Sequence, residues 1–402
     1  MPAIADTRVL VEDGVISPDQ AAEILARSRS VMMSMAINAI LTGGIVAATG
    51  GLIFWLADAL AVACVGLVAL FLGYLILRKG SGQFRMFGTA ATLIGAGLLI
   101  GGAGVELVLN FEELAGGTMI LAGGLIAAAA AYSYRNARHE NAFVIGALTA
   151  MGIGLHFAGF LHLFELHEIS GITTSGFNFY AAALLICVGW FLDVRLVTAL
   201  AIVPFAQILD TGVFYQHAIY AFYSPESTLT ILQMVALIAL CLWAARTRDM
   251  RHARHALILA VMAFIVANLS ALVGSLWGDY VGESIWGPDR RTSSQSYDDW
   301  IEHRDAFRAT AIYIHETVFS IVWAAALLGV VAWAAHVHNR GLFYAGLTFG
   351  GIHAYTQMFE EFGDEPLAFV IGGLAAIPLA WGMWRLNTLF TKVADGPEGT
   401  RV

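Results

Sequence analysis

The sequence predicts an all-α polytopic membrane protein with about twelve transmembrane helices arranged as successive hairpins. Composition is the first observation, because 58% of the residues are hydrophobic and 13% are charged, which is far more apolar than a soluble domain. The second is a series of apolar stretches of about 20 residues, the length that crosses the hydrocarbon core as a helix. The third is an uneven distribution of Lys and Arg. Open strands would leave backbone groups unpaired in lipid, so helices are expected.

Residues 1–32 are predicted to form a short cytosolic helical segment. Ser17 can cap a helix with Pro18 at its first position, and Gln20 three residues on completes a capping box. Apolar residues follow at helical spacing, at Ala21, Ile24 and Leu25. We expect this helix to lie against the membrane or the bundle, or to dock a cytosolic protein partner. The polar lead-in before the first apolar stretch is unlike a cleaved signal peptide.

The transmembrane bundle is expected over residues 33–386, followed by a cytosolic tail over 387–402. Basic residues close successive hairpins, which favours a series of two-helix units. These residues are Arg78, Arg135, Arg195 and Arg246. The predicted spans are 34–56, 59–77, 86–108, 116–134, 142–165, 178–194, 196–217, 227–245, 256–277, 308–335, 341–359 and 366–385.

Positive charge marks one side of the predicted bundle. When the connections are numbered alternately, 17 of the 21 Lys and Arg fall at the two ends and in one set of connections. Lys and Arg favour the cytoplasmic side, so this set and both termini are expected in the cytoplasm of a bacterial inner membrane. The other side carries Arg290, Arg291, Arg304 and Arg308, all near one long loop.

Formal charge divides in the same way, at +7 on the cytoplasmic side and −16 on the outer side. The acidic outer face either solvates the surface or collects cations in a vestibule. Basic residues are spread along the cytoplasmic rim and form no patch, so membrane lipids are expected partners and no nucleic acid is implied.

One outer connection, residues 278–307, is much longer than the tight turns elsewhere. It combines aromatic with acidic side chains, and Ser296 with Asp299 can cap a helix that runs into the next span. We expect the loop to be outside and at least partly ordered. Its aromatics Trp286, Tyr297 and Trp300 favour an anchor at the headgroup level, and a lid over the bundle is the alternative.

Glycines and cysteines within the spans are assigned to packing. Glycines such as Gly95 and Gly102 would let helix backbones approach closely. The three cysteines, Cys64, Cys187 and Cys241, all lie inside predicted spans, and the sequence has no Cys-x-x-Cys pair.

Both ends of the chain are similar to one family. The resemblance is carried by the opening Leu10-Val11-Glu12-Asp13-Gly14-Val15-Ile16-Ser17 with the helix after it, and by a closing hairpin with Tyr355, Phe359, Glu360, Glu361, Phe362 and Ile371-Gly372-Gly373-Leu374. These segments, about a quarter of the chain, resemble bacterial membrane proteins known as domain of unknown function 2157. The resemblance implies architecture alone, because the family has no agreed activity or catalytic residues. The long acidic outer loop departs from it.

Ionisable groups inside a membrane are costly, so they are the default functional candidates. Several share a helical face, as His162 does with Glu165, Asp210 with His217, and His353 with Gln357. The candidates for a polar, outward-facing cavity are Glu106, His156, His162, Glu165, Asp210, His217, His315, Glu316, His353, Gln357 and Glu360.

Imidazole and carboxylate groups from several helices are what a divalent metal such as zinc, or a shared proton site, would need. The alternative is that each histidine makes an interhelical hydrogen bond or lies at the interface. The sequence has no His-x-x-x-His, repeated Glu-x-x-His or haem attachment motif, so known catalytic metal patterns are not supported.

Two further features bear on the bundle. Pro204 lies six residues before Asp210 in one predicted span, which indicates either a packing kink or a broken helix that exposes an ion site. Histidines beside Arg at the cytoplasmic edge are expected to be solvated or to contact lipid headgroups. They are His139, His252, His255, His336 and His338.

Three functions remain open. The first is transport or ion handling through the polar cavity, since twelve spans with both ends inside suit secondary transporters. The second is a membrane sensor or scaffold whose acidic outer loop receives a signal. The third is an intramembrane metal-dependent enzyme, which the missing ligand motifs place last, so a protein without enzymatic activity is favoured.

Overall fold

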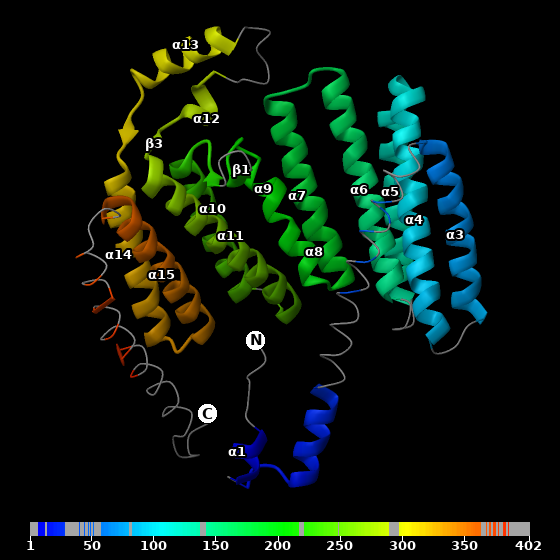
Figure 1. The fold of residues 1–402 in the computed structure, drawn as a ribbon, viewed down its shortest axis with the longest axis horizontal. Coiled ribbons are helices and arrows are strands. Elements are labelled where there is room, and N and C mark those ends of the chain that lie inside the picture. The colour runs from blue at the N-terminus through cyan, green and yellow to red at the C-terminus, as the bar shows by residue number, and fades with distance from the viewer. Residues whose placement is uncertain are drawn as a thin grey trace. The chain divides into compact units, whose positions relative to one another are not determined.

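The computed structural model describes residues 7–12, 14–28, 58–79, 83–136, 142–216, 221–247, 249–288 and 297–362, with isolated positions between 40 and 51 and between 367 and 385. The chain divides into two compact units, Met1–Ser170 and Gly171–Val402 (Figure 1). The described helices of the first unit are α1 (Thr7–Glu12), a helix over 18–28, α3 (Ala59–Lys79), α4 (Gln83–Asn110), α5 (Glu112–Asn136) and α6 (Ala142–Leu166).

The predicted capping box at the start of the helix over 18–28 is confirmed. The backbone N–H of Gln20 donates to Ser17 Oγ at 3.2 Å, and the backbone N–H of Ser17 donates to Gln20 Oε1 at 2.9 Å. Two backbone donors that a helix leaves unpaired at its start are therefore satisfied. Ile24 and Leu25 remain about half exposed, so part of the apolar stripe faces outward.

Glycines bring the helices of the first unit into backbone contact. A Cβ at Gly95 of α4 would lie 2.2 Å from Leu70 N of α3, and one at Gly102 would lie 2.7 Å from Ala63 N. The same pattern joins α5 to α6, where a Cβ at Gly123 would lie 2.4 Å from the backbone N of His156. These glycines pack as expected, because a side chain would push the paired helices apart.

The second unit is also helical, with two short antiparallel β-pairs. In the first pair Phe214 lies opposite Tyr223, and in the second Asp279 lies opposite Ile314. Its described elements are α7 (Ile172–Leu192), α8 (Arg195–Leu200), α9 (Ile202–Ala206), β1 (Phe214–Gln216), β2 (Ala221–Tyr223), α10 (Ser227–Thr247), α11 (Met250–Trp277), β3 (Asp279–Tyr280), α12 (Glu283–Trp286), α13 (Tyr297–Arg308), β4 (Tyr313–Ile314), α14 (Glu316–His336) and α15 (Arg340–Phe362).

Within the described residues, eight helices are long and apolar enough to cross a membrane, and each overlaps one of the predicted spans. These helices are α3, α4, α5, α6, α7, α10, α11 and α14. The predicted eleventh span corresponds to α15, which is long but is not among the eight. The first and last predicted spans, 34–56 and 366–385, lie largely outside the described residues.

Two predicted spans differ from the structure. The seventh, 196–217, is two short helices followed by a turn and β1, because Pro204 and Gly212 interrupt an otherwise apolar run. The tenth, 308–335, begins as a helix only at Glu316, since residues 309–315 form a turn and β4.

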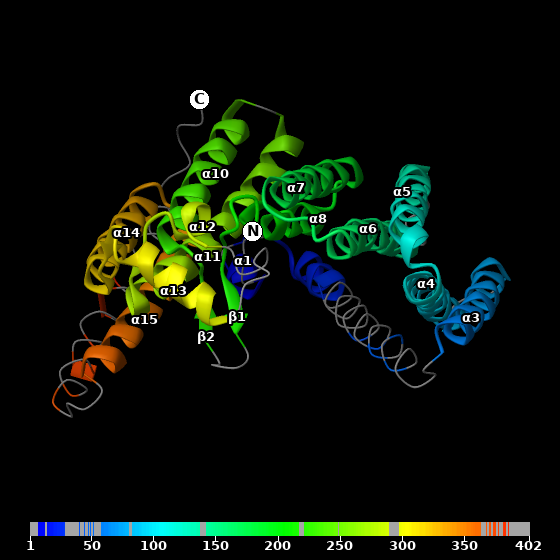
Figure 2. The same ribbon diagram turned by 90° about the horizontal axis from the view of Figure 1, so that it is seen from above.

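The chain between α11 and α14 forms a small ordered region, which we name the acidic lobe, residues 279–288 and 297–314. It contains β3, α12, α13 and β4, so the expectation of a partly ordered loop is confirmed for these residues. Pairing of β3 with β4 brings the start of α14 beside the end of α11. Figures 1 and 2 show α12 and α13 together at this end of α11. The predicted cap Ser296 lies outside the described residues.

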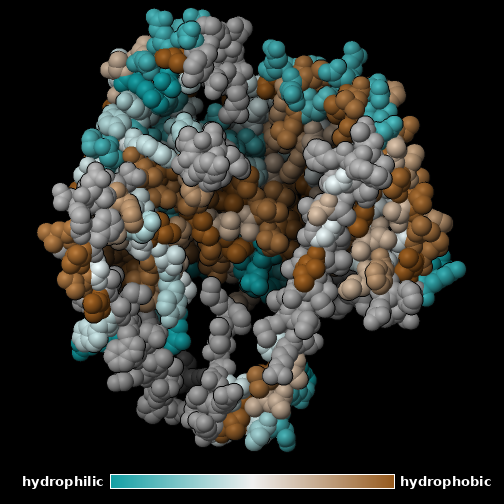
Figure 3. Space-filling model, in the orientation of Figure 1, coloured by the Kyte–Doolittle hydropathy of each residue, from teal (hydrophilic) through white to brown (hydrophobic). Residues whose placement is uncertain are grey.

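The sides of the long helices carry exposed apolar side chains. Leu125 of α5 is 71% exposed, and Ile321 and Leu328 of α14 are 66% and 71% exposed. Figure 3 shows hydrophobic side chains along the helix sides and hydrophilic ones near helix ends. Water would make such surfaces costly, whereas lipid tails would not, so these helices are those of a membrane-embedded protein.

Candidate functional site

Residues 195–213 interrupt the series of long helices with two short helices and a run of turns, and we name them the broken segment. Pro204 has no N–H to donate to Leu200, so the helical ladder is interrupted between α8 and α9. After Ala206 the chain continues as tight turns, with Asp210 at φ 53° and Gly212 at φ 113°. The left-handed backbone at Asp210 ends any helical continuation. Notably, α8 and α9 together are too short to cross a membrane as one helix.

The carbonyls released by this break are bound by side chains from neighbouring helices. Gln233 Nε2 of α10 donates to Phe205 O at 2.7 Å, and Asn178 Nδ2 of α7 donates to Gln207 O at 3.1 Å. Carbonyls without partners inside a bilayer would cost several kcal/mol each. Both carbonyls also accept a backbone N–H of the following turns, from Ile208 and Asp210, so the two amides are second donors that attach the break to α10 and α7.

A buried hydroxyl group at the break has two possible acceptors. Thr211, which is fully buried, places Oγ1 2.9 Å from both Ala206 O and Gln233 Oε1. Its single hydroxyl hydrogen can be donated to one of them at a time. Gln207 Nε2 in turn donates to Thr211 O at 2.7 Å. The Thr211 hydroxyl can thus switch its hydrogen between an acceptor on the broken segment, Ala206 O, and one on α10, Gln233 Oε1.

The network continues from the break toward the acidic lobe. Gly212 N donates to Thr230 Oγ1 at 3.1 Å, and that hydroxyl donates to Glu226 O at 2.9 Å. Thr230 is fully buried, and Ser224 Oγ lies 3.3 Å from it. A chain of hydrogen bonds therefore joins the broken segment to the first turn of α10.

Two buried carboxylates fasten the acidic lobe to α10. Glu226, 3% exposed, accepts the backbone N–H of Gly282 at 2.8 Å and of Ser284 at 3.0 Å. Asp279, 6% exposed, accepts the N–H of Ser227 at 3.2 Å and of Thr228 at 2.8 Å. We name this pair of side chains, Glu226 and Asp279, the carboxylate clasp. Within this pair, Asp279 satisfies the first two N–H donors of α10, and its negative charge suits the positive end of that helix dipole.

Within the acidic lobe an arginine joins α12 to α13. Arg308 donates to both carboxylate oxygens of Glu283, at 2.8 and 3.1 Å, and its guanidinium lies 4.7 Å from the centre of the Tyr280 ring. Trp300 Nε1 donates to Pro288 O at 3.0 Å. Burial, followed by the Glu283 charge, raises the pKa of the nearby Tyr223 hydroxyl. Side-chain hydrogen bonds and ring contacts, as well as backbone pairing, therefore hold the acidic lobe together.

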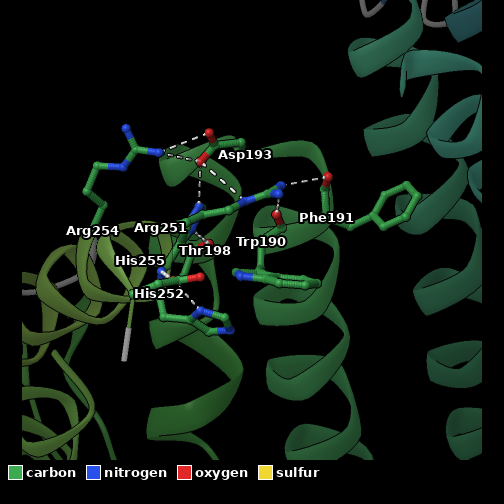
Figure 4. A network of polar contacts seen from close by, with 9 residues as sticks. Trp190, Phe191, Asp193, Thr198, Arg251, His252, Arg254 and His255 are labelled. Atoms are coloured by element: carbon green, nitrogen blue, oxygen red, sulfur yellow. Dashed lines mark hydrogen bonds and ion pairs between the residues drawn. The ribbon is translucent and has the colours of Figure 1, made fainter. Parts of the chain in front are cut away.

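The opposite end of α11 carries a histidine linked to two partners (Figure 4). His255, 4% exposed, places Nδ1 2.7 Å from Thr198 Oγ1 of α8 and Nε2 3.1 Å from Asp193 Oδ1 of the α7–α8 turn. Thr198 is 1% exposed, whereas the Asp193 side chain is 45% exposed. One imidazole therefore connects an accessible carboxylate to a buried hydroxyl of the broken segment.

Two arginines surround this histidine. Arg254 Nη2 donates to Asp193 Oδ2 at 3.1 Å, and Arg251 Nη2 donates to Phe191 O at 3.0 Å and also to Trp190 O. The hydrogen bond from His255, followed by the charges of Arg254 and Arg251, lowers the pKa of the Asp193 carboxyl, and burial opposes this only partly. We name Asp193, Thr198, Arg251, Arg254 and His255 the basic cluster.

The predicted candidates of the first unit do not meet in one site there. His156 Nδ1 bonds Ile120 O at 2.8 Å and His162 Nε2 bonds Glu112 O at 3.0 Å, so both α6 histidines bind the backbone of α5. Glu106 of α4 accepts a hydrogen bond from Asn110, one turn later, and Glu165 is exposed. These contacts match the alternative of interhelical hydrogen bonds for the two histidines.

The first unit also holds a pocket of about 370 Å³ between α4, α5 and α6. It is lined by apolar side chains and glycines, including Val105, Met119 and Leu155. Its lining differs from the polar cavity that the sequence predicted.

In the second unit the predicted candidates occupy separate places. Asp210 lies in the broken segment, while His315 caps α14 and pairs with Glu316 at 3.3 Å. His353 of α15 packs edge-on against Trp323, with ring centres 4.6 Å apart, and Gln357 lies one turn farther along α15. His217 and the side chain of Glu360 lie outside the described residues.

Metal binding gains no support from the described part of the chain. Among those residues, no three His, Cys, Asp or Glu side chains come close enough to hold one ion. Of the predicted cavity candidates, His315 and Glu316 form an imidazole–carboxylate pair, and two ligands are too few for a metal site.

The expectation that His255 is solvated is wrong. Helix α11 begins at Met250, well before the predicted start at 256, so His255 lies on a helical face that packs against α7 and α8. His252, 44% exposed and paired with Asp249, fits the expectation, as do the exposed His336 and His338. His139 lies outside the described residues.

Sequence reasoning also missed the carboxylate clasp and the amides at the break. Asn178, Gln207 and Gln233 are uncharged, so a search for ionisable groups in apolar spans passes over them. A count of amides near Pro204 would have found Gln207, whereas Asn178 and Gln233 come from other helices.

No family model, curated protein or solved structure matches this chain. The similarity of its two ends to the domain of unknown function 2157 family therefore stays a prediction.

Proposed function

We propose that this protein transports small cations across a bacterial inner membrane, and that the broken segment forms part of the path. The carrying observation is the set of carbonyls at Phe205, Ala206 and Gln207, which bind side-chain donors at the point where the regular helix gives way to turns. Broken helices whose free carbonyls bind ions are a recurring device of secondary transporters. The broken segment resembles those transporter sites in its local architecture and in its chemistry.

The depth of the break supports this proposal. Twelve residues of helix from Arg195 to Ala206 rise about 18 Å, roughly half of a bilayer about 30 Å thick. The exposed carbonyls would then lie near the middle of the membrane, where transporters hold their ions. Irregular backbone at that depth is tolerated where it lines a polar interior.

The amides supply a way to open and close such a site. Gln233, Asn178 and Thr211 occupy the carbonyls in the state described here. A cation that bound these oxygens would displace the N–H and O–H donors, which can turn their own oxygens toward it.

Orientation follows from charge. In the second unit Arg195, Arg251 and Arg254 lie at one end of α11, and Glu226 and Asp279 lie at the other. We place the arginine end in the cytoplasm and the acidic lobe outside, with both termini cytoplasmic. The broken segment runs from the first end to the second, so it takes the place of the seventh of twelve crossings.

Flux measurements on reconstituted protein test the proposal. Thr230→Val removes the hydroxyl that accepts the Gly212 N–H, and Gln233→Leu removes the donor to Phe205 O. We expect Na⁺ or H⁺ flux into vesicles to fall about tenfold or more in each variant. Thr230→Val leaves the buried Gly212 N–H without its acceptor, at a cost of about 1–3 kcal/mol, and Gln233→Leu removes an amide oxygen that could turn toward the cation. Thr348→Val is the matched control, since that exposed hydroxyl bonds only within its own helix.

Two results would contradict the transport proposal. One is wild-type flux of Na⁺ and H⁺ no faster than in protein-free vesicles. The other is unchanged flux in both Thr230→Val and Gln233→Leu when each variant elutes as folded protein.

A second candidate is a membrane sensor whose acidic lobe receives a signal. The carboxylate clasp favours it, because Glu226 and Asp279 connect the lobe directly to the first turn of α10. This function predicts that Glu226→Gln alters hydrogen exchange in α10 and the broken segment while wild-type vesicles pass neither ion. A change in hydrogen exchange confined to the acidic lobe would argue against the sensor function.

A further inference from the structure

We propose that His255 is a proton-binding site that couples the broken segment to the pH of the arginine-rich end of the second unit. This inference deepens the proposed transport function, because it names the proton as the coupling ion. Its geometric basis is the connection of one buried imidazole to Asp193 on one side and Thr198 on the other.

The partners define the protons in the described state. A carboxylate only accepts hydrogen bonds, so Nε2 of His255 carries the hydrogen that points to Asp193. In a neutral ring Nδ1 is then the acceptor, and the Thr198 hydroxyl donates to it across 2.7 Å. Both ring nitrogens and the hydroxyl hydrogen are satisfied.

Binding of one proton reverses the second hydrogen bond. The proton attaches to Nδ1, which becomes a donor, and Thr198 Oγ1 must then accept. Its own hydroxyl hydrogen turns toward another acceptor, such as a carbonyl of the preceding helical turn. No covalent bond other than the new N–H is formed or broken, and the cluster gains one positive charge.

The reversal acts at a point with little free space. A Cβ at Gly189 of α7 would clash with Thr198 Oγ1, so this hydroxyl of α8 packs directly against the α7 backbone. The same hydroxyl joins α8 to α11 through His255. A change of donor at Thr198 therefore alters how the first half of the broken segment is attached to two long helices.

Charged side chains from several elements surround the proton site. Asp193, from the α7–α8 turn, pairs with His255 and also with Arg251 and Arg254 of α11. His252 pairs with Asp249 one turn earlier on α11, and Arg195 lies exposed at the start of α8. The half-exposed Asp193 side chain provides the contact with solvent.

Proton binding can be measured without any transport. In purified full-length protein with ¹³C-labelled histidine, His255→Gln identifies the ring resonance of His255. We expect that resonance to shift with pH as Nδ1 gains its proton. Thr198→Val, which removes the hydroxyl and keeps the shape, should move the midpoint, and Thr198→Ser should restore it. A resonance that does not titrate, or one unmoved by Thr198→Val, overturns the inference.

Coupling is tested by the pH profile of flux in vesicles holding a pH-sensitive dye. We expect wild-type H⁺ flux to change about tenfold over the titration of one group, and Thr198→Val to reduce that change to less than about twofold. His252→Gln is the matched control, because that exposed histidine is one turn away on the same helix and should leave the profile unchanged.

The two proposals fail in different ways. Titration of His255 that responds to Thr198→Val, in protein that passes no ion, would keep the proton site and reject transport. Flux with a pH profile unaffected by Thr198→Val would keep transport and reject the coupling role of His255. If His255→Gln does not fold, the Thr198→Val and Thr198→Ser pair still decides the question.

Discussion

Glu226 and Asp279 bind each other's segments reciprocally. Glu226 precedes α10 and accepts backbone N–H groups at residues 282 and 284, while Asp279 follows α11 and accepts those of the first two residues of α10. Both side chains are almost fully buried, although 52 residues separate them. Each carboxylate therefore matches two backbone donors that would otherwise be unpaired.

This relationship predicts that the protein loses stability when either carboxylate is replaced by the matching amide. Glu226→Gln and Asp279→Asn replace an accepting oxygen by an NH₂ group that faces a backbone donor. We expect each to lower unfolding free energy by about 2 kcal/mol or more, because a buried donor is left unpaired. Thermal unfolding in detergent measures the effect. Asp305→Asn is the control, since Asp305 is 61% exposed and pairs only with the adjacent Arg304. Equal midpoints for all three variants would contradict the assignment.

Asp193 predicts a pH-dependent contribution to stability. Its folded-state pKa is lowered, first by the hydrogen bond from His255 and then by the arginines. The stabilisation is therefore fully present above the unfolded-state value of about 3.9 and is lost as pH falls through the lower folded value. Asp193→Asn should lower the melting temperature near neutral pH, and the difference from wild type should shrink below about pH 4. A difference that stays constant as the pH falls well below about 4 would count against this cause.

Helix packing in the first unit is tested by two glycines of α5. A Cβ at Gly123 would lie 2.4 Å from a backbone atom of α6, whereas nothing lies within 4 Å of one at Gly117. We expect Gly123→Ala to destabilise the protein by about 1–3 kcal/mol through overpacking. Gly117→Ala should be neutral or slightly stabilising, because alanine favours helix. Similar melting temperatures for the two variants would argue against close α5–α6 contact.

Topology is tested by reporter fusions. Fusions at Met1 and Val402 should report a cytoplasmic location, as should an insertion in the α10–α11 turn beside Arg246. An insertion next to Trp286 of the acidic lobe should report the outside. A periplasmic signal from either terminus would invalidate the proposed orientation.

The helices could largely be predicted from the sequence because their signal is local. A run of apolar residues of bilayer length between polar residues specifies α3, α6 or α10 without knowledge of any neighbour. The capping box at Ser17 and Gln20 is equally local, since both hydrogen bonds close within four residues. Local patterns of this kind need no tertiary contact to be recognised.

Local hydropathy was insufficient where polar contacts decide the backbone. The seventh predicted span is apolar enough to be a helix, and the sequence favoured a packing kink at Pro204 over a broken helix. Its broken form pairs the carbonyls at the break within its own turns and adds donors from Asn178 of α7 and Gln233 of α10. Partners that lie about 30 residues away in sequence become visible only when the helices are packed.

By itself the sequence determined the helical membrane class, the positions of the long helices and the separation of basic from acidic ends. Tertiary structure alone decided that His255 is buried against Thr198 and Asp193, and that Glu226 and Asp279 bind across the start of α10. The physical reason is the distance along the chain over which each feature is defined. Hydrophobic length is a property of consecutive residues, whereas a buried polar group is defined by partners that folding brings from distant parts of the chain.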